Sequence, residues 1–240
     1  MINRISYFLE LLLLVPLFPF LAYKGNAVRK RVMKLPARSE FLQIEAEETN
    51  ASSLLVVGES TATGVGASGE RTTFAWHLVS MLHQKHHVYN LGKNGLVAAR
   101  LPRLLTHAKP ELPATFQYAV VLIGANDCFK FTPPWKFQKE LEKFIKILVK
   151  GKSVKKIVIP LIPPVQQFPA IPKIMGVFLG WHRRILTKEL NAIDHRHPEV
   201  SFIDLSREFP AGFFAEDGIH PSDLGYHQMA TEIAKKINTL

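Results

Sequence analysis

The chain has 240 residues, of which 47% are hydrophobic and 21% charged, and it contains one cysteine. This length suits one compact domain, the composition argues against a disordered chain, and a single cysteine excludes an intrachain disulfide. The formal net charge of +10 favours anionic partners, but the sequence carries no signature of a nucleic-acid-binding module, so we expect no nucleic-acid partner.

The first 36 residues differ in character from the rest of the chain. An apolar run from Tyr7 to Tyr23 is interrupted by Glu10 and two prolines, and basic residues follow it. The run is slightly short for a membrane-spanning helix, and its end lacks a good signal-peptide cleavage site. We predict that residues 1–36 associate with a membrane, because the apolar run can enter it and anionic lipid would attract the basic stretch. The alternatives are a spanning helix, a cleaved signal and a helix packed on the domain.

The charge distribution around this apolar run also bears on location. Lysine and arginine are in excess after the run, which favours a cytoplasmic catalytic domain if the helix spans a membrane. An exported protein and a soluble cytoplasmic protein are the alternatives. Nothing in the sequence indicates the oligomeric state.

Short apolar runs alternate with helical patterns after a predicted linker at residues 37–51. Residues 52–240 form the predicted domain, and its runs are continuous rather than alternating, as expected for strands that helices bury on both faces. We predict an α/β fold, a three-layer α/β/α sandwich with a parallel sheet of about five strands. The predicted strands are 53–57, 87–91, 118–123, 156–161 and 200–205, and the predicted helices are 74–84, 96–107, 135–150, 177–193 and 224–237.

Ligands of such sheets bind beyond the carboxyl ends of the strands, and polar segments follow three of the predicted strands. Ser60 follows the first strand and could serve as a nucleophile if a base lies beside it. Gly95 follows the second strand, where a glycine lets a backbone N–H approach a ligand closely. Asn126 follows the third strand, and its amide could donate a hydrogen bond to an oxyanion. Each could equally be an ordinary turn residue.

The fourth polar segment, Asp217-Gly218-Ile219-His220, precedes the last predicted helix. An aspartate three residues before a histidine can hold one imidazole nitrogen, which leaves the other nitrogen to accept a serine proton. Aspartate and histidine can also bind metals, but no further ligand spacing supports a metal site. We therefore predict no metal and no organic cofactor.

Taken together and in this order, the four segments resemble the motif blocks of the SGNH hydrolase superfamily, also called GDSL esterases and lipases. The blocks read GESTATG, NLGKNG, GAND and DGIH in this chain. The resemblance implies a flavodoxin-like fold for residues 52–240. It also implies a catalytic triad and an oxyanion hole: Ser60, Asp217 and His220 for the triad, and Ser60, Gly95 and Asn126 for the oxyanion hole.

The first block departs from the usual G-D-S-L pattern. Glu59 and Thr61 stand where the family has aspartate and leucine, while the serine is kept. This departure concerns the subfamily, and the resemblance still implies a serine esterase.

The resemblance implies a carboxylic ester as substrate, cleaved through an acyl-enzyme, with a lipid or lysophospholipid as the leading class. An apolar, proline-rich stretch after the fourth strand is placed to line an acyl pocket, and we predict Ile174, Met175 and Phe178 as substrate-binding residues. Packing of this stretch within the core is the alternative. The other functional alternatives are an acetyl or acyl esterase or an acyltransferase acting on saccharides or other small molecules, and a non-catalytic membrane-associated relative.

Overall fold

The computed structural model describes residues 2–47, 51–82, 86–108, 112–205 and 209–239, and their centre is a six-stranded sheet of order β1-β3-β2-β4-β5-β6. The five strands from β2 to β6 run parallel to their neighbours, and their order along the sheet is flavodoxin-like. The predicted parallel α/β sandwich is therefore confirmed. The strands are β1 (Phe41–Ile44), β2 (Ser52–Gly58), β3 (His86–Gly92), β4 (Tyr118–Leu122), β5 (Lys156–Pro160) and β6 (Val200–Ile203).

Strand β1 is the element of the sheet that the sequence analysis missed. It lies within residues 37–51, predicted as a linker, and pairs antiparallel with β3 from Phe41 opposite Leu91 to Ile44 opposite Val88. An antiparallel edge strand on an otherwise parallel sheet is common, and it raises the strand number from about five to six. Its four residues are too few to show a clear alternation in the sequence.

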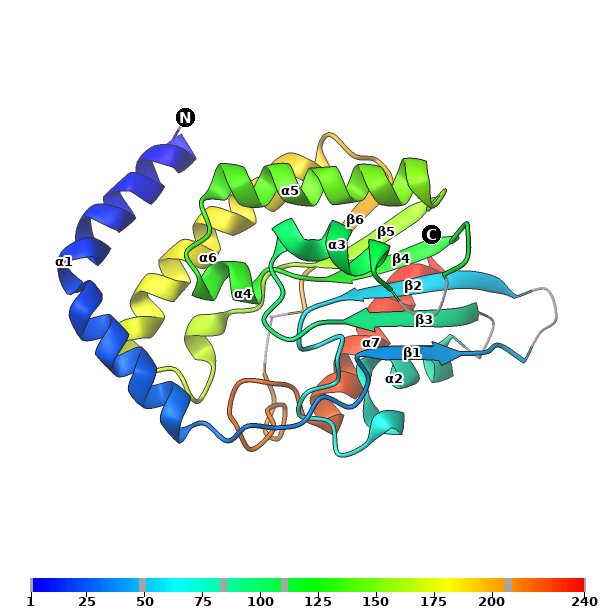
Figure 1. Ribbon diagram of the computed structural model, residues 1–240, viewed down its shortest axis with the longest axis horizontal. Helices are drawn as coiled ribbons and strands as arrows, with labels where there is room; N and C mark the ends of the chain where they lie inside the picture. Colours follow the sequence, from blue (N-terminus) through cyan, green and yellow to red (C-terminus); the bar gives the residue numbers. More distant parts are fainter. Residues whose placement is uncertain (1, 48–50, 83–85, 109–111, 206–208, 240) are drawn as a thin grey trace.

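Helices cover both faces of the sheet (Figure 1). Helices α2 and α7 pack together on one face, and α3, α5 and α6 lie on the other. Short helical turns η1 (Glu70–Thr72), η2 (Ala98–Arg100) and η4 (Val165–Gln167) join these elements, and a π-helical turn, η3 (Ile147–Gly151), extends α5. The helices are α2 (Phe74–Met81), α3 (Leu101–Thr106), α4 (Ala125–Phe129), α5 (Pro134–Lys146), α6 (Lys173–Asp194) and α7 (Asp223–Asn238).

The two layers of helices bury opposite faces of the same strands. In β2, Leu54 and Val56 face the core under α2 and α7, whereas Leu55 and Val57 face the core under α3, α5 and α6. All four side chains are fully buried. Burial on both faces explains why the strand reads as a continuous apolar run.

The first helix, α1 (Ile2–Arg31), stands outside the two layers and packs one face along α6 (Figure 1). Figure 1 shows that it bends near its middle, where Pro16 and Pro19 each remove a backbone hydrogen bond. The most apolar 18-residue window of this helix has a mean hydropathy of 2.0, which by length and composition is enough to cross a membrane. Only 22% of that window is buried within the structure. One face of α1 is therefore docked on the domain, and the other is an exposed apolar surface.

Candidate active site

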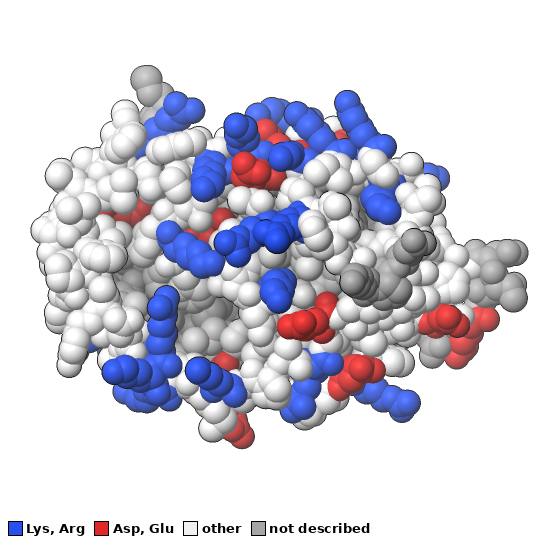
Figure 2. Space-filling view, in the orientation of Figure 1, with Lys and Arg blue, Asp and Glu red and all other residues white. Residues whose placement is uncertain are grey.

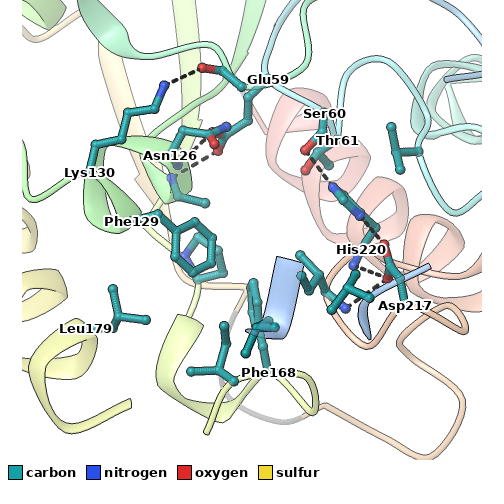
Figure 3. Close-up of a pocket in the computed structure, with 18 of the residues that line it drawn as sticks. Glu59, Ser60, Thr61, Asn126, Phe129, Lys130, Phe168, Leu179, Asp217 and His220 are labelled. Carbon is teal, nitrogen blue, oxygen red and sulfur yellow. Dashed lines mark hydrogen bonds and ion pairs between the residues drawn. The ribbon is translucent and has the colours of Figure 1, made fainter. Parts of the chain in front are cut away.

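Ser60 lies on the tight turn that follows β2, at the carboxyl edge of the sheet. The turn begins at Gly58, where a Cβ atom would collide with the carbonyl oxygen of Leu122 on β4. The Ser60 hydroxyl oxygen lies 2.9 Å from Nε2 of His220, which comes from the segment before α7 (Figure 3). The fold therefore brings together two side chains that are 160 residues apart.

Asp217 holds the other side of the His220 ring. Its Oδ2 lies 2.5 Å from Nδ1 of His220, and its Oδ1 accepts the backbone N–H groups of Ile219 and His220 at 2.9 and 3.0 Å. Burial alone would raise the pKa of the Asp217 carboxyl, but these hydrogen bonds outweigh burial and hold the pKa below its usual value. The carboxylate stays ionised and fixes the orientation of the imidazole.

Asn126 reaches the same region from the first turn of α4, which Gly124 opens with a φ of +120°. The Nδ2 atom of Asn126 donates to Oε2 of Glu59 at 2.6 Å, and Figure 3 shows this pair across the cavity from Ser60 and His220. An amide nitrogen carries two hydrogens. The bond to Glu59 uses one hydrogen and leaves the second for a ligand in the cavity.

Glu59 is the residue of this site that the sequence analysis did not assign. Its carboxylate also accepts the backbone N–H groups of Ala125 and Asn126 at 3.0 and 2.9 Å, so three donors from α4 converge on one buried side chain. Burial raises the pKa of Glu59 to about 7, against the lowering effect of these hydrogen bonds. Its position directly before the nucleophile candidate was the available signal, but the sequence analysis treated it as a subfamily difference.

Two backbone N–H groups are also candidates for binding a ligand in the cavity, like the second hydrogen of the Asn126 amide. Within the described part of the chain, the N–H groups of Ser60 and Gly95 donate no hydrogen bond to another residue. Gly95 has a φ of +71°, which favours glycine, and a Cβ there would meet no atom within 4 Å. The Gly95 carbonyl oxygen accepts a hydrogen bond from the Lys130 ammonium at 2.9 Å, which ties the residue to the segment that follows α4.

A cavity of about 1080 Å³ opens beside these residues, and all five predicted catalytic and oxyanion residues line it. Of the predicted substrate-binding residues, Met175 and Phe178 line the cavity. Ile174 lies in the first turn of α6 with 43% of its surface exposed and does not line the cavity, so the cavity lends this expectation no support. Among the residues that the structure describes, no group of three or more His, Cys, Asp or Glu side chains could hold a metal ion.

Comparison with known proteins assigns the chain to a family. A family model described as the GDSL-like lipase/acylhydrolase family matches residues 56–228, more than half of the chain. The chain belongs to this family. The match supports a hydrolase of the esterase type and confirms the resemblance to GDSL hydrolases. No match to a curated protein sequence is found.

Solved structures share the GDSL fold at low sequence identity. A lipolytic protein of the G-D-S-L family from Veillonella parvula is 17% identical, with a TM-score of 0.64, and the alignment covers 79% of this chain and 100% of that one. Est24, a carbohydrate acetylesterase from Sinorhizobium meliloti, is 17% identical with a TM-score of 0.60, covering 78% and 99%. The M. smegmatis aryl esterase is 16% identical with a TM-score of 0.59, covering 79% and 100%.

Proposed function

We propose that this protein is a serine ester hydrolase that cleaves a carboxylic ester through an acyl-enzyme. The observation that carries the proposal is the line of hydrogen bonds from Ser60 through His220 to Asp217, with distances of 2.9 and 2.5 Å. A serine hydroxyl is a weak nucleophile, and a histidine held in this way can remove its proton as the bond to carbon forms.

In the proposed reaction, the Ser60 oxygen attacks the ester carbonyl while Nε2 of His220 takes the hydroxyl proton. The N–H groups of Ser60 and Gly95 and the free hydrogen of the Asn126 amide stabilise the negative oxygen of the tetrahedral intermediate. The carbon–oxygen bond to the alcohol then breaks, and the alcohol leaves with the proton from His220. Water repeats the sequence on the acyl-enzyme, releasing the acid and restoring Ser60.

Labelling with a fluorophosphonate probe tests this proposal directly. The intact protein should react at Ser60, and the S60A variant should neither react nor hydrolyse p-nitrophenyl esters. Equal labelling of the variant would place the reactive serine elsewhere and refute the assignment. Absence of labelling in both proteins would favour the alternative of a non-catalytic relative.

A second candidate is a carbohydrate acetylesterase, because Est24 is described as one and another structural neighbour is described as a carbohydrate esterase. An acyltransferase would use the same acyl-enzyme with an acceptor other than water. The large apolar cavity favours a longer acyl group over acetate. Comparing p-nitrophenyl acetate with longer esters separates the two: a strict preference for acetate would support the acetylesterase.

We also propose that α1 attaches the protein to an anionic membrane surface. Its outer face exposes large apolar side chains, among them Leu12 at 69% and Val15 at 68%. Figure 2 shows a nearly uncharged left edge, where α1 lies, with basic side chains gathered at its lower end. Those basic residues include Arg29, Lys30 and Arg31 in the last turn. Lysines and arginines near an anionic surface contribute about 1 kcal/mol each and are screened by salt.

Sedimentation with vesicles tests the membrane proposal. The protein should sediment with vesicles that contain phosphatidylglycerol, less with pure phosphatidylcholine, and less again as salt is raised. Equal binding to both vesicle types at every salt concentration would refute the electrostatic part of the proposal. No binding to either would refute membrane attachment.

A further inference from the structure

The cavity beside Ser60 is larger than a short acyl group requires. Its volume of about 1080 Å³ lies just above the usual range for small-molecule sites, roughly 300–1,000 Å³. In Figure 3, Phe129, Phe168 and Leu179 face the space that lies between Asn126 and Ser60. The polar groups of the site therefore lie at the boundary of a predominantly apolar space.

One wall of this cavity comes from α1, outside the region that matches the family model. The apolar α1 residues that line it recur at helical spacing and form one stripe: Leu14, Phe18, Leu21, Ala22, Gly25 and Val28. Asn26 and Arg29 add polar groups near the end of the helix. From Leu14 to Val28 a helix rises by about 21 Å, since each residue adds 1.5 Å. On the facing helix, Met175 approaches closely: a Cβ on Gly25 would lie 3.6 Å from its Cε atom.

Polar side chains within the apolar run of α1 hold its amino-terminal half on the domain. Glu10 and His182 are both fully buried, with Oε2 and Nδ1 2.8 Å apart, and Nε2 of His182 lies 3.1 Å from the carbonyl oxygen of Thr132. Trp181 donates its indole N–H to the hydroxyl of Ser6 at 3.0 Å. Moving α1 away into lipid would leave these buried polar groups without partners, at a large cost.

We propose that the stripe on α1 and the facing side of α6 bind the long acyl chain of a lipid ester whose carbonyl is attacked by Ser60. The proposal rests on the proposed esterase for its chemistry, and on the cavity for its substrate class. A saturated chain matches an apolar wall of this length, and each methylene removed from water contributes about fourfold in affinity. The α1 helix thereby sets the acyl-chain specificity.

The A22W variant tests the wall, with L13W as the matched control. Ala22 lines the cavity, whereas Leu13 lies on the outer face of the same helix with 51% of its surface exposed. In A22W, kcat/KM for p-nitrophenyl palmitate should fall by more than about tenfold, since lost contact with two methylenes suffices. The ratio of kcat/KM for p-nitrophenyl palmitate to kcat/KM for p-nitrophenyl acetate should fall in A22W, and L13W should match the wild type on both esters.

A binding measurement separates the acyl-chain site from the esterase chemistry. Dodecylphosphocholine has one saturated chain and no carboxylic ester, and below its critical micelle concentration calorimetry should show that it binds the S60A protein. Adding A22W should weaken this binding by more than about tenfold, and adding L13W should not. Melting temperatures check that each variant is folded.

The outcomes are distinguishable. If dodecylphosphocholine does not bind, or if folded A22W binds it as tightly as L13W does, the acyl-chain site is refuted even when the protein hydrolyses short esters. If A22W weakens binding but no ester is hydrolysed and no fluorophosphonate reacts, the acyl-chain site stands and the proposed esterase is refuted.

Discussion

Replacing Glu59 with glutamine probes how the Asn126 amide is positioned. The carboxylate of Glu59 accepts hydrogen bonds from Nδ2 and the backbone N–H of Asn126 and from the N–H of Ala125. A glutamine has one acceptor oxygen and one N–H₂ group, so at least one of these donors would face another donor. In E59Q the Asn126 side chain should lose its fixed direction while the nucleophile and base keep theirs.

The expected kinetic effect follows from the value of one oxyanion donor. Losing such a donor outright lowers kcat by about 100–1,000-fold, and a donor that is present but misdirected should cost about 10–100-fold. Because Glu59 acts through Asn126, E59Q should have little further effect, within about twofold, in a protein that already carries N126A. Such non-additivity is expected of residues that act as a unit.

The same substitution has a separate effect on stability, and its sign follows from the raised pKa. The ordinary pKa of 4.5 is raised to about 7 in the fold, so the folded protein holds this proton where the unfolded chain has lost it. The stabilisation by protonated Glu59 is complete below pH 4.5 and is lost as the pH rises through about 7. A pKa shift of this size corresponds to a change of about 3 kcal/mol in the free energy of unfolding between low and high pH. E59Q lacks this pH-dependent contribution.

The assays are p-nitrophenyl ester hydrolysis by the four proteins of the double-mutant cycle and urea unfolding at pH 4.5 and 7.5. Between these pH values, the free energy of unfolding of the wild type should fall by about 3 kcal/mol more than that of E59Q. If the reductions in kcat caused by E59Q and N126A instead multiply in the double variant, Glu59 does not act through Asn126. If both proteins lose stability in parallel with pH, Glu59 is not the buried group that titrates.

Three further predictions concern the oxyanion donor, the attachment of α1 and its outer face. N126A should lower kcat by about 100–1,000-fold without changing fluorophosphonate labelling greatly, and unchanged ester hydrolysis would exclude Asn126 from the oxyanion hole. E10A should destabilise the protein by about 3–5 kcal/mol in urea unfolding because it leaves Nδ1 of His182 buried without its partner, whereas the double variant E10L/H182F should recover most of this loss. Equal stability of the single and double variants would contradict the pairing. L12E should reduce sedimentation with anionic vesicles by more than about tenfold, while L224E, at an exposed leucine on α7 (45%, against 69% for Leu12), should not. Equal effects of the two would argue that α1 is not the membrane-facing element.

The parallel strands and the main helices could be predicted because each repeats a local pattern. Continuous apolar runs marked the strands from β2 to β6, and amphipathic spacing marked α5 and α7. Strand β1 was not predicted because its pairing with β3 is a long-range contact made by only four residues. Helix α4 was also missed, because its five residues overlap the GAND segment, which reads as a turn.

The candidate site shows the same division between local and long-range information. The motif order indicated Ser60 and His220, and the fold brings them within hydrogen-bonding distance. The part played by Glu59 depends on contacts with α4 across the sheet edge, which no local spacing reveals. The predicted helix began at residue 177, so the sequence could not show that Ile174, in the first turn of α6, lies outside the cavity lining.

The contribution of α1 to the cavity was equally hidden. This helix is apolar almost all the way around, so periodicity could not separate the face that lines the cavity from the face that meets solvent or lipid. The buried Glu10 was read only as an interruption of the apolar run, although it is the residue that fixes the register of α1 on α6 through His182.

The two ends of α1 are secured by different means. Just after the helix, the N–H groups of Arg38 and Ser39 both reach the carbonyl oxygen of Thr63 at 2.9 Å, and β1 follows at the sheet edge. The beginning of the helix is held by the pair of Glu10 and His182 and by hydrogen bonds from Trp181 to Ser6 and from Asn3 to the carbonyl oxygen of Ile185. If these contacts open together, α1 can swing about its carboxyl end while the sheet stays folded. The free energy of this local opening, measured by amide hydrogen exchange, would then be smaller than that of global unfolding. The cavity wall would thus belong to a separate cooperative unit, one that can open and close without unfolding the sheet that carries Ser60.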